Sequence, residues 1–192
     1  MEAAKKIDIN KRYTYADYLT WNDDERWELI DGVPYNMAPA PSWGHQGVSG
    51  DISRQIGNYL KGHPCRVFYS PIDVRLDASG ADDTIVQPDI LIVCDESKLE
   101  EDGRSVIGAP DFTLEIISPH SAIRDWVVKR ELYEKYGVKE YWIIDLKNRI
   151  LVVNILEDGK YVSESYDESN TAVPIKVLEG CTIDLTEVFK ET

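Results

Sequence analysis

The stretches IVQPDILIV at residues 85–93 and FTLEII at residues 112–117 decide the fold of this 192-residue chain. Both are short, rich in β-branched residues and bounded by turn-forming residues, so both are predicted to be buried strands. Each carries an acid in its middle, Asp89 in the first and Glu115 in the second. An ionised carboxylate in a buried strand costs free energy unless it is paired or binds a metal. The two acids are therefore the first candidates for a functional site.

Patterns typical of helices and strands surround these two stretches. Thr14 is a candidate N-cap for a short helix over residues 15–21, and Asp31-Gly32 is a strong turn signal inside a hairpin at residues 26–37. Two longer helices are predicted, one that follows Gly44 and stops near Gly62 and one from Ser121 to about Tyr136. Further strands are predicted at 65–69, 72–76 and 141–145. A hairpin at 149–166 and an irregular strand with a terminal helical turn at 175–188 complete the chain. The order predicts one α/β domain over residues 1–192, with a mixed sheet and hairpins near both ends.

Composition limits the partners that this chain can have. Its 21 basic and 35 acidic residues give a net charge of −14, which argues against a non-specific binder of polyanions. Basic residues nevertheless gather on the predicted helix after Ser121, so a local basic surface remains compatible with the sequence: Arg124, Lys129, Arg130, Lys135 and Lys139.

Two features concern the compartment. No apolar stretch approaches the roughly 20 residues that span a bilayer, and the N-terminal residues lack the apolar region of a secretory leader. The cysteines Cys65, Cys94 and Cys181 are far apart and odd in number. They are predicted to be buried free thiols of a reducing compartment, which favours a cytoplasmic protein with no membrane partner.

Strand geometry links the two acids. Side chains alternate along a strand, so Asp89 shares a face with Leu91, and Glu115 shares a face with Thr113. If the strands are neighbours, both carboxylates point into one crevice, where they must share a proton or a divalent cation. Oxygen ligands suit Mg²⁺ or Mn²⁺, and a lysine near such an ion can stabilise charge on a phosphate.

An ordered set of motifs carries a resemblance to a known family. The motifs are WELIDG at residues 27–32, GHQ at 44–46, VQPD at 86–89, LEIISP at 114–119, Asp125 with Lys129 and Tyr133, and YWIID at 141–145. Together they resemble the Uma2 family of the PD-(D/E)xK, restriction-endonuclease-like nuclease superfamily, over at least residues 13–156.

The resemblance implies a restriction-endonuclease-like fold, a mixed central sheet flanked by helices with added hairpins at both ends. It also implies a metal-dependent endonuclease that hydrolyses phosphodiester bonds of nucleic acid with Mg²⁺ or Mn²⁺. Asp89, Glu115 and the main-chain carbonyl of Ile116 would bind the metal. Ile117 occupies the position where the superfamily has its lysine, and Lys129 on the following helix would supply the missing catalytic cation. Glu28 and His45 match other recurring positions and would be accessory ligands or substrate contacts.

Each assignment has a plainer alternative. Asp89, directly after Pro88, could merely end a strand and cap a turn, and a structural reading of this kind applies to Glu115 as well. Lys129 lies four residues after Asp125, so a helix-surface ion pair would explain it. Glu28 could face solvent from its hairpin strand, and His45 could serve only the first turn of its helix. The aromatic residues Trp27, Tyr133, Tyr141 and Trp142 are expected in the core rather than on a base-stacking surface.

The same acidic residues leave two other functions open, a non-catalytic binding or assembly domain and a hydrolase of a small phosphate ester. With a net charge of −14, any binding of nucleic acid is expected to be weak and salt-sensitive. A homodimer is also expected, because edge strands such as residues 149–156 could pair between subunits.

Overall fold

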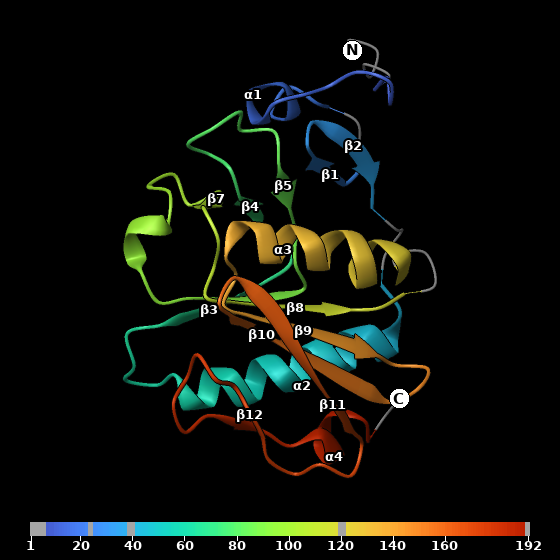
Figure 1. Ribbon diagram of the computed structural model, residues 1–192, viewed down its shortest axis with the longest axis vertical. Coiled ribbons are helices and arrows are strands. Elements are labelled where there is room, and N and C mark those ends of the chain that lie inside the picture. Colours follow the sequence, from blue (N-terminus) through green and yellow to red (C-terminus); the bar gives the residue numbers. More distant parts are fainter. Residues whose placement is uncertain (1–6, 23–24, 38–40, 119–121, 191–192) are drawn as a thin grey trace.

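The structure is a computed structural model that describes residues 7–22, 25–37, 41–118 and 122–190. It contains two larger mixed sheets, a two-stranded pair and several helices (Figure 1). Both larger sheets combine parallel and antiparallel pairs, with β4–β7 and β8–β9 as the parallel ones. The α/β fold predicted from the sequence is confirmed.

The smaller of these two sheets has the strand order β2-β1-β5-β4-β7. Its strands are β1 (Trp27–Ile30), β2 (Val33–Asn36), β4 (Asp73–Arg75), β5 (Ile85–Val86) and β7 (Ser105–Ile107). The predicted turn joins β1 to β2, and both Asp31 and Gly32 have positive φ angles, of 47° and 74°. The short helix α1 (Tyr15–Tyr18) precedes this hairpin and begins at Thr14, whose hydroxyl forms a capping box with Asp17.

The larger sheet has the order β11-β10-β9-β8-β6-β3. Its strands are β3 (Arg66–Tyr69), β6 (Ile90–Val93), β8 (Phe112–Ile116), β9 (Glu140–Asp145), β10 (Ile150–Glu157) and β11 (Lys160–Asp167). A short 3-10 turn, η1 (Glu96–Lys98), follows β6. The remaining strands and last helix are β12 (Val173–Pro174), β13 (Thr182–Ile183) and α4 (Leu185–Val188).

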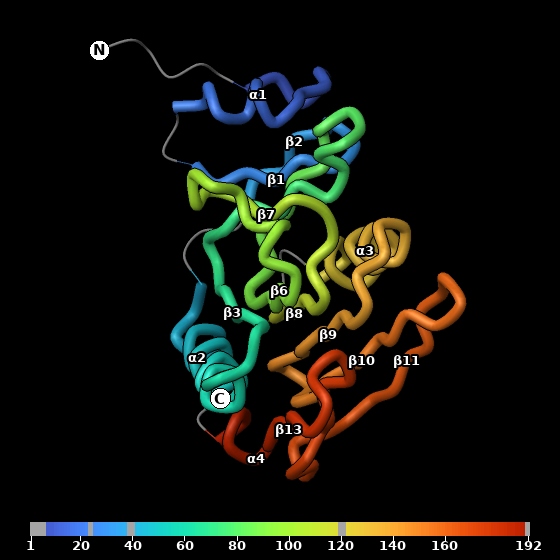
Figure 2. The backbone as a smooth tube through the Cα atoms, turned by 90° about the vertical axis from the view of Figure 1, so that its left-hand side faces the viewer, coloured from blue at the N-terminus to red at the C-terminus, as the bar shows by residue number. Residues whose placement is uncertain are grey.

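Two helical segments cover opposite faces of the larger sheet (Figures 1 and 2). Helix α2 (Trp43–Tyr59) packs Val48, Ile52 and Ile56 against the face that carries Ile90 and Leu114. On the other face lie the π-helix η2 (Arg124–Lys129) and its continuation α3 (Arg130–Tyr136), with the predicted cap Ser121 outside the described residues. Leu132 and Tyr133 pack there with Leu91 and Ile143.

The prediction of one continuous strand over residues 85–93 is wrong. The chain forms β5 in the smaller sheet, leaves it at Gln87, and enters the larger sheet as β6. Pro88 has no N–H for a ladder, and the N–H of Gln87 donates instead to Oε1 of Glu28 at 3.0 Å. Asp89 therefore lies at the junction of the two sheets rather than in the middle of a strand.

The expectation that residues 149–156 form an edge strand is also wrong. Strand β10 pairs with β9 on one side and with β11 on the other, so its backbone is engaged along both sides. The edge strands of the larger sheet are β11 and β3 instead. The hairpin around Asp158-Gly159 is present as predicted.

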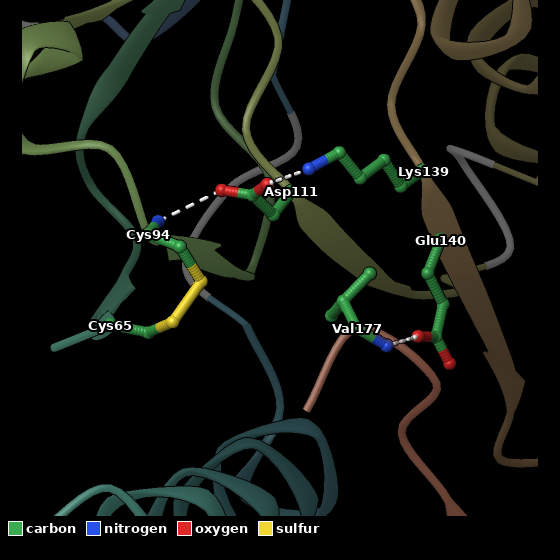
Figure 3. The surroundings of a disulfide bond; sticks show 6 residues. All are labelled: Cys65, Cys94, Asp111, Lys139, Glu140 and Val177. Carbon is green, nitrogen blue, oxygen red and sulfur yellow. Dashed lines mark hydrogen bonds and ion pairs between the residues drawn. A yellow bond between two sulfur atoms is a disulfide. The ribbon is translucent and has the colours of Figure 1, made fainter. Parts of the chain in front are cut away.

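The prediction of three free thiols is wrong for two of them, because Cys65 and Cys94 form a disulfide (Figure 3). Antiparallel pairing sets Arg66 opposite Val93, which makes the flanking cysteines cross-strand neighbours despite a separation of 29 residues. The disulfide removes the argument from free thiols for a reducing compartment. Cys181 is free and buried, as expected.

The described helices include none that is both long enough and apolar enough to cross a membrane.

Candidate active site

A cleft of about 780 Å³ opens where the chain passes from one larger sheet to the other. Residues from α2, β8, η2 and the junction between β5 and β6 form its walls. Those that bear on its chemistry are Arg26, His45, Gln87, Asp89, Glu115, Ile116, Arg124, Asp125 and Lys129. The structure thus brings four of the five predicted site side chains to one cleft, and the fifth, Glu28, lies behind it.

Asp89 is half-buried and held through one oxygen. Its Oδ2 accepts a hydrogen bond from the N–H of Ile116 at 2.8 Å and lies 3.2 Å from Nε2 of His45. His45 is the third residue of α2, and its Nδ1 is buried without a hydrogen-bond partner among the described residues. These contacts fix the carboxylate while leaving Oδ1 outside both of them.

Glu115 is 4% exposed in the middle of β8, as the sequence predicts. Its Oε1 accepts hydrogen bonds from Nζ of Lys129 at 2.7 Å and from the hydroxyl of Tyr133 at 2.9 Å. Burial raises the pKa of Glu115 well above its usual value, and the nearby charges of Asp125, Asp89 and Glu28 add to this rise, while Lys129 opposes it. The carboxyl therefore favours either a proton or an additional cation beside it.

Lys129 is 2% exposed and surrounded by acids. Its Nζ lies 2.7 Å from Oε1 of Glu115, 2.8 Å from Oε1 of Glu28 and 3.8 Å from Oδ1 of Asp125. Burial alone would lower the pKa of Lys129, but the three carboxylates raise it above its ordinary value. The lysine is therefore a buried ammonium, and the explanation by a surface ion pair with Asp125 is wrong.

A π-helix brings Lys129 to this position. The segment η2 has the i→i+5 hydrogen bonding of a π-helix, a rare geometry that often occurs at functional sites. Asp125 and Lys129 are its buried residues, and Tyr133 follows in α3. The sequence predicted a helix over this segment but gave no signal for the π-turn.

Glu28 is fully buried in β1, so its predicted exposure to solvent as an alternative is wrong. Its Oε1 accepts from the N–H of Gln87 at 3.0 Å and contacts Lys129, while its Oε2 lies 3.5 Å from Nε of Arg124. Glu28 thus connects the smaller sheet to the cations of η2. Among the aromatic residues expected in the core, Tyr133, Tyr141 and Trp142 are buried.

Sequence reasoning missed Arg124 as a member of the site. Its side chain is 17% exposed and lines the cleft. The sequence marked Arg124 only as one of several basic residues on the predicted helix, with nothing to distinguish it from the others. Arg26 was missed too, because its guanidinium reaches Gln87 and Ser70 across 61 and 44 residues of sequence. Only the tertiary fold brings these residues together.

The donor set of the cleft fits a hard divalent cation. Asp89 and Glu115 supply carboxylate oxygens, and Ile116, whose carbonyl is the remaining predicted ligand, lines the same cleft. Magnesium and manganese bind through one or two carboxylates together with water and substrate oxygens. Within residues 7–22, 25–37, 41–118 and 122–190, no group of three or more His, Cys, Asp or Glu side chains is arranged to hold a metal. A bound ion would therefore depend on water, main-chain or substrate oxygens for much of its coordination.

Comparisons with known proteins agree with this fold. A crystal structure described as "a putative nuclease belonging to DUF820" from Anabaena variabilis matches with a TM-score of 0.74 and 22% sequence identity, covering 93% of this chain and 98% of that one. No curated protein matches the chain. The model of the Uma2 family, described as "Putative restriction endonuclease", matches residues 15–186. Since that match spans most of the sequence and includes both sheets and the cleft, the chain belongs to the Uma2 family.

Proposed function

We propose that this chain is a metal-dependent nuclease that hydrolyses phosphodiester bonds of nucleic acid in the cleft between the two sheets. The observation that carries the proposal is that Asp89 and Glu115, 26 residues apart in sequence, line one cleft together with Arg124 and Lys129. A scaffold without catalysis gains no stability from burying charged groups, since buried ion pairs are often no better than apolar contacts.

Asp89, Glu115 and the carbonyl of Ile116 would hold Mg²⁺ or Mn²⁺. When bound, such an ion lowers the pKa of a coordinated water and neutralises charge on the phosphate. The protein orients the ligands in advance. Ile116 N–H and His45 hold Asp89 through Oδ2, and Lys129 and Tyr133 hold Glu115 through Oε1.

Lys129 acts in this proposal through the carboxylates that surround it. Its ammonium compensates the charge of Glu28, Glu115 and Asp125 and fixes the rotamer of Glu115. Glu28 in turn fixes Lys129, and His45 fixes Asp89, so both accessory residues position ligands rather than act on the substrate themselves.

Hydrolysis of a small phosphate ester is the second candidate. A net charge of −14 disfavours a long polyanionic substrate, and a cleft of about 780 Å³ falls within the range of ordinary small-molecule pockets. The two candidates share the same site and the same metal, and they differ in how much of the substrate lies outside the cleft.

The test is cleavage by the pure protein at low ionic strength with Mg²⁺ or Mn²⁺. Single-stranded DNA, duplex DNA, RNA and bis(p-nitrophenyl) phosphate would be compared, with chelator and Glu115→Gln as controls. We expect turnover of nucleic acid that chelator and Glu115→Gln abolish, because the amide removes a charge with almost no change of shape. Turnover of the small ester alone would support the second candidate. Cleavage that persists in Glu115→Gln would belong to another site, and no cleavage with either metal would leave a binding domain.

A further inference from the structure

Two cations of η2 line the cleft, and they differ in how far their charge is already engaged. Lys129 is 2% exposed and contacts three carboxylates. Arg124 is 17% exposed, and its one ion pair among the described residues joins Nε to Oε2 of Glu28 at 3.5 Å. The charge of Lys129 is therefore used within the protein, whereas that of Arg124 is largely available to a ligand.

The hydrogen bonding of Arg124 is also incomplete. Its Nε is buried and has no hydrogen-bond partner among the described residues, and Oε2 of Glu28 likewise has none. A separation of 3.5 Å supplies Coulomb attraction but is longer than the 2.7–2.9 Å usual for a charge-assisted hydrogen bond. A buried donor without such a bond contributes little to holding the guanidinium in place. The exposed part of the side chain lines the cleft, where a ligand oxygen can meet it.

We propose that Arg124 is a further catalytic residue that contacts the non-bridging oxygens of the substrate phosphate, while Lys129 remains a positioning residue. The inference rests on the proposed function. A guanidinium presents donors in a planar fork that matches phosphate in a bidentate way, and it stays charged at every working pH. Placed in the same cleft as Asp89 and Glu115, the fork of Arg124 stabilises negative charge that develops on the phosphate during hydrolysis.

The experiment compares wild type, Arg124→Ala and Arg124→Lys, with Lys135→Gln as the matched control. Lys135 lies on the continuation of the same helix and its side chain is 58% exposed, so this control removes the same charge away from the cleft. Turnover of bis(p-nitrophenyl) phosphate with Mn²⁺ is measured with and without free guanidinium ion. Binding of inorganic phosphate to the Mn²⁺-loaded protein is measured by calorimetry, and thermal unfolding checks each fold.

We expect Arg124→Ala to lower kcat by about 100-fold, the loss typical of removing one donor that stabilises a transition state. Free guanidinium should restore part of that loss. The kcat of Arg124→Lys should lie between those of wild type and Arg124→Ala, and the kcat of Lys135→Gln should match wild type. Phosphate binding should weaken at least about tenfold in Arg124→Ala, since a charge-assisted bidentate contact is lost.

Several results would overturn the inference. Turnover and phosphate binding within twofold of wild type in Arg124→Ala would show that the residue does not touch the phosphate. Losses that guanidinium does not rescue, and that accompany a lower unfolding temperature, would assign Arg124 to holding Glu28. If wild type has no turnover but its phosphate binding depends on Arg124, the proposed function fails. The contact between Arg124 and phosphate is then supported, but its catalytic role is not. If neither turnover nor phosphate binding depends on Arg124, the inference fails.

Discussion

At the scale of single residues, the site is a group of buried charges with an excess of acid. Glu28, Glu115 and Asp125 surround Lys129, and Arg124 adds a second positive charge at one side. Asp89 raises the negative charge further, which is one reason why the pKa of Glu115 is raised. A divalent cation would offset this imbalance, so the charge of the group itself favours binding of a metal.

Replacing Lys129 by methionine tests how far this group depends on its central cation. The change leaves Glu28 and Glu115 buried without the ammonium that contacts both of them. We expect a loss of about 3–5 kcal/mol in the free energy of unfolding at pH 7, the range found when one partner of a buried ion pair is removed. Urea denaturation measures it, with Lys135→Met as the exposed control. A loss below about 1 kcal/mol in Lys129→Met would mean that the carboxylates do not need the lysine.

The hydroxyl of Tyr133 is the second group that holds Glu115. Tyr133→Phe removes the 2.9 Å hydrogen bond to Oε1 and leaves the ring in the core. We expect destabilisation of about 1–3 kcal/mol, because hydrogen bonds to charged groups contribute at the upper end of the usual range. If the proposed function holds, turnover should fall while the fold remains intact. Unchanged stability and unchanged turnover would together show that Tyr133 only fills space.

At the scale of elements, alternation along a strand predicted the orientation of one acid but not of the other. Glu115 lies in β8 and, as predicted, points to the face that η2 and α3 cover, where it meets Lys129 and Tyr133. The same argument does not hold for Asp89, because this residue precedes β6 and contacts His45 of α2. The break between β5 and β6 has a signal in the sequence, Pro88, which cannot donate to a ladder. The passage into a second sheet was not predictable, because the contact that holds it there comes from Glu28, 59 residues from Gln87 in sequence. The π-turn in η2 and the reach of Arg124 depend in the same way on tertiary contacts.

The C-terminal segment is attached to β9 through Glu140, whose carboxylate accepts from Trp142 Nε1 at 2.7 Å and from Val177 N–H at 2.9 Å (Figure 3 shows the latter). Burial raises the pKa of Glu140 from 4.5 to about 7, although these two hydrogen bonds by themselves would lower it. The folded state therefore binds this proton more tightly than the unfolded state. The stability that this proton gives is complete below pH 4.5 and is lost as the pH rises through 7.

Glu140→Gln isolates this effect, because the amide does not titrate. The free energy of unfolding of the variant relative to wild type should increase by up to about 3 kcal/mol between pH 4.5 and 7.5, from the size of the shift. Denaturation of both proteins at several pH values measures the difference. Parallel pH profiles for the two proteins would contradict the raised pKa of Glu140.

At the scale of the whole molecule, the charge of −14 and the composition of the cleft limit how nucleic acid can bind. Among the residues that line the cleft, the cations that are not fully buried are Arg26, Arg124 and Lys147. Contacts to phosphates by these three would be few, which agrees with the expectation of weak binding. Few contacts also make the salt dependence modest, because its slope scales with the number of phosphates contacted. The homodimer stays a prediction, and within the hairpin of β10 and β11 the strand that has a free edge is β11.

The salt dependence of binding measures the number of phosphates that are contacted. With Ca²⁺ in place of Mg²⁺ to limit turnover, the slope of log K against log salt for a short oligonucleotide should be roughly −2 to −3. Fluorescence anisotropy between about 20 and 200 mM salt would give this slope. A slope steeper than roughly −6 would require a phosphate-binding surface well beyond the cleft.

The most direct test of the central claim is anomalous scattering from crystals of the protein soaked with Mn²⁺. We expect one dominant manganese peak at roughly 2.0–2.3 Å, a direct coordination distance, from carboxylate oxygens of both Asp89 and Glu115. We expect this peak to be lost in crystals of Glu115→Gln. A cleft free of manganese, or a dominant peak at carboxylates elsewhere on the molecule, would contradict the account.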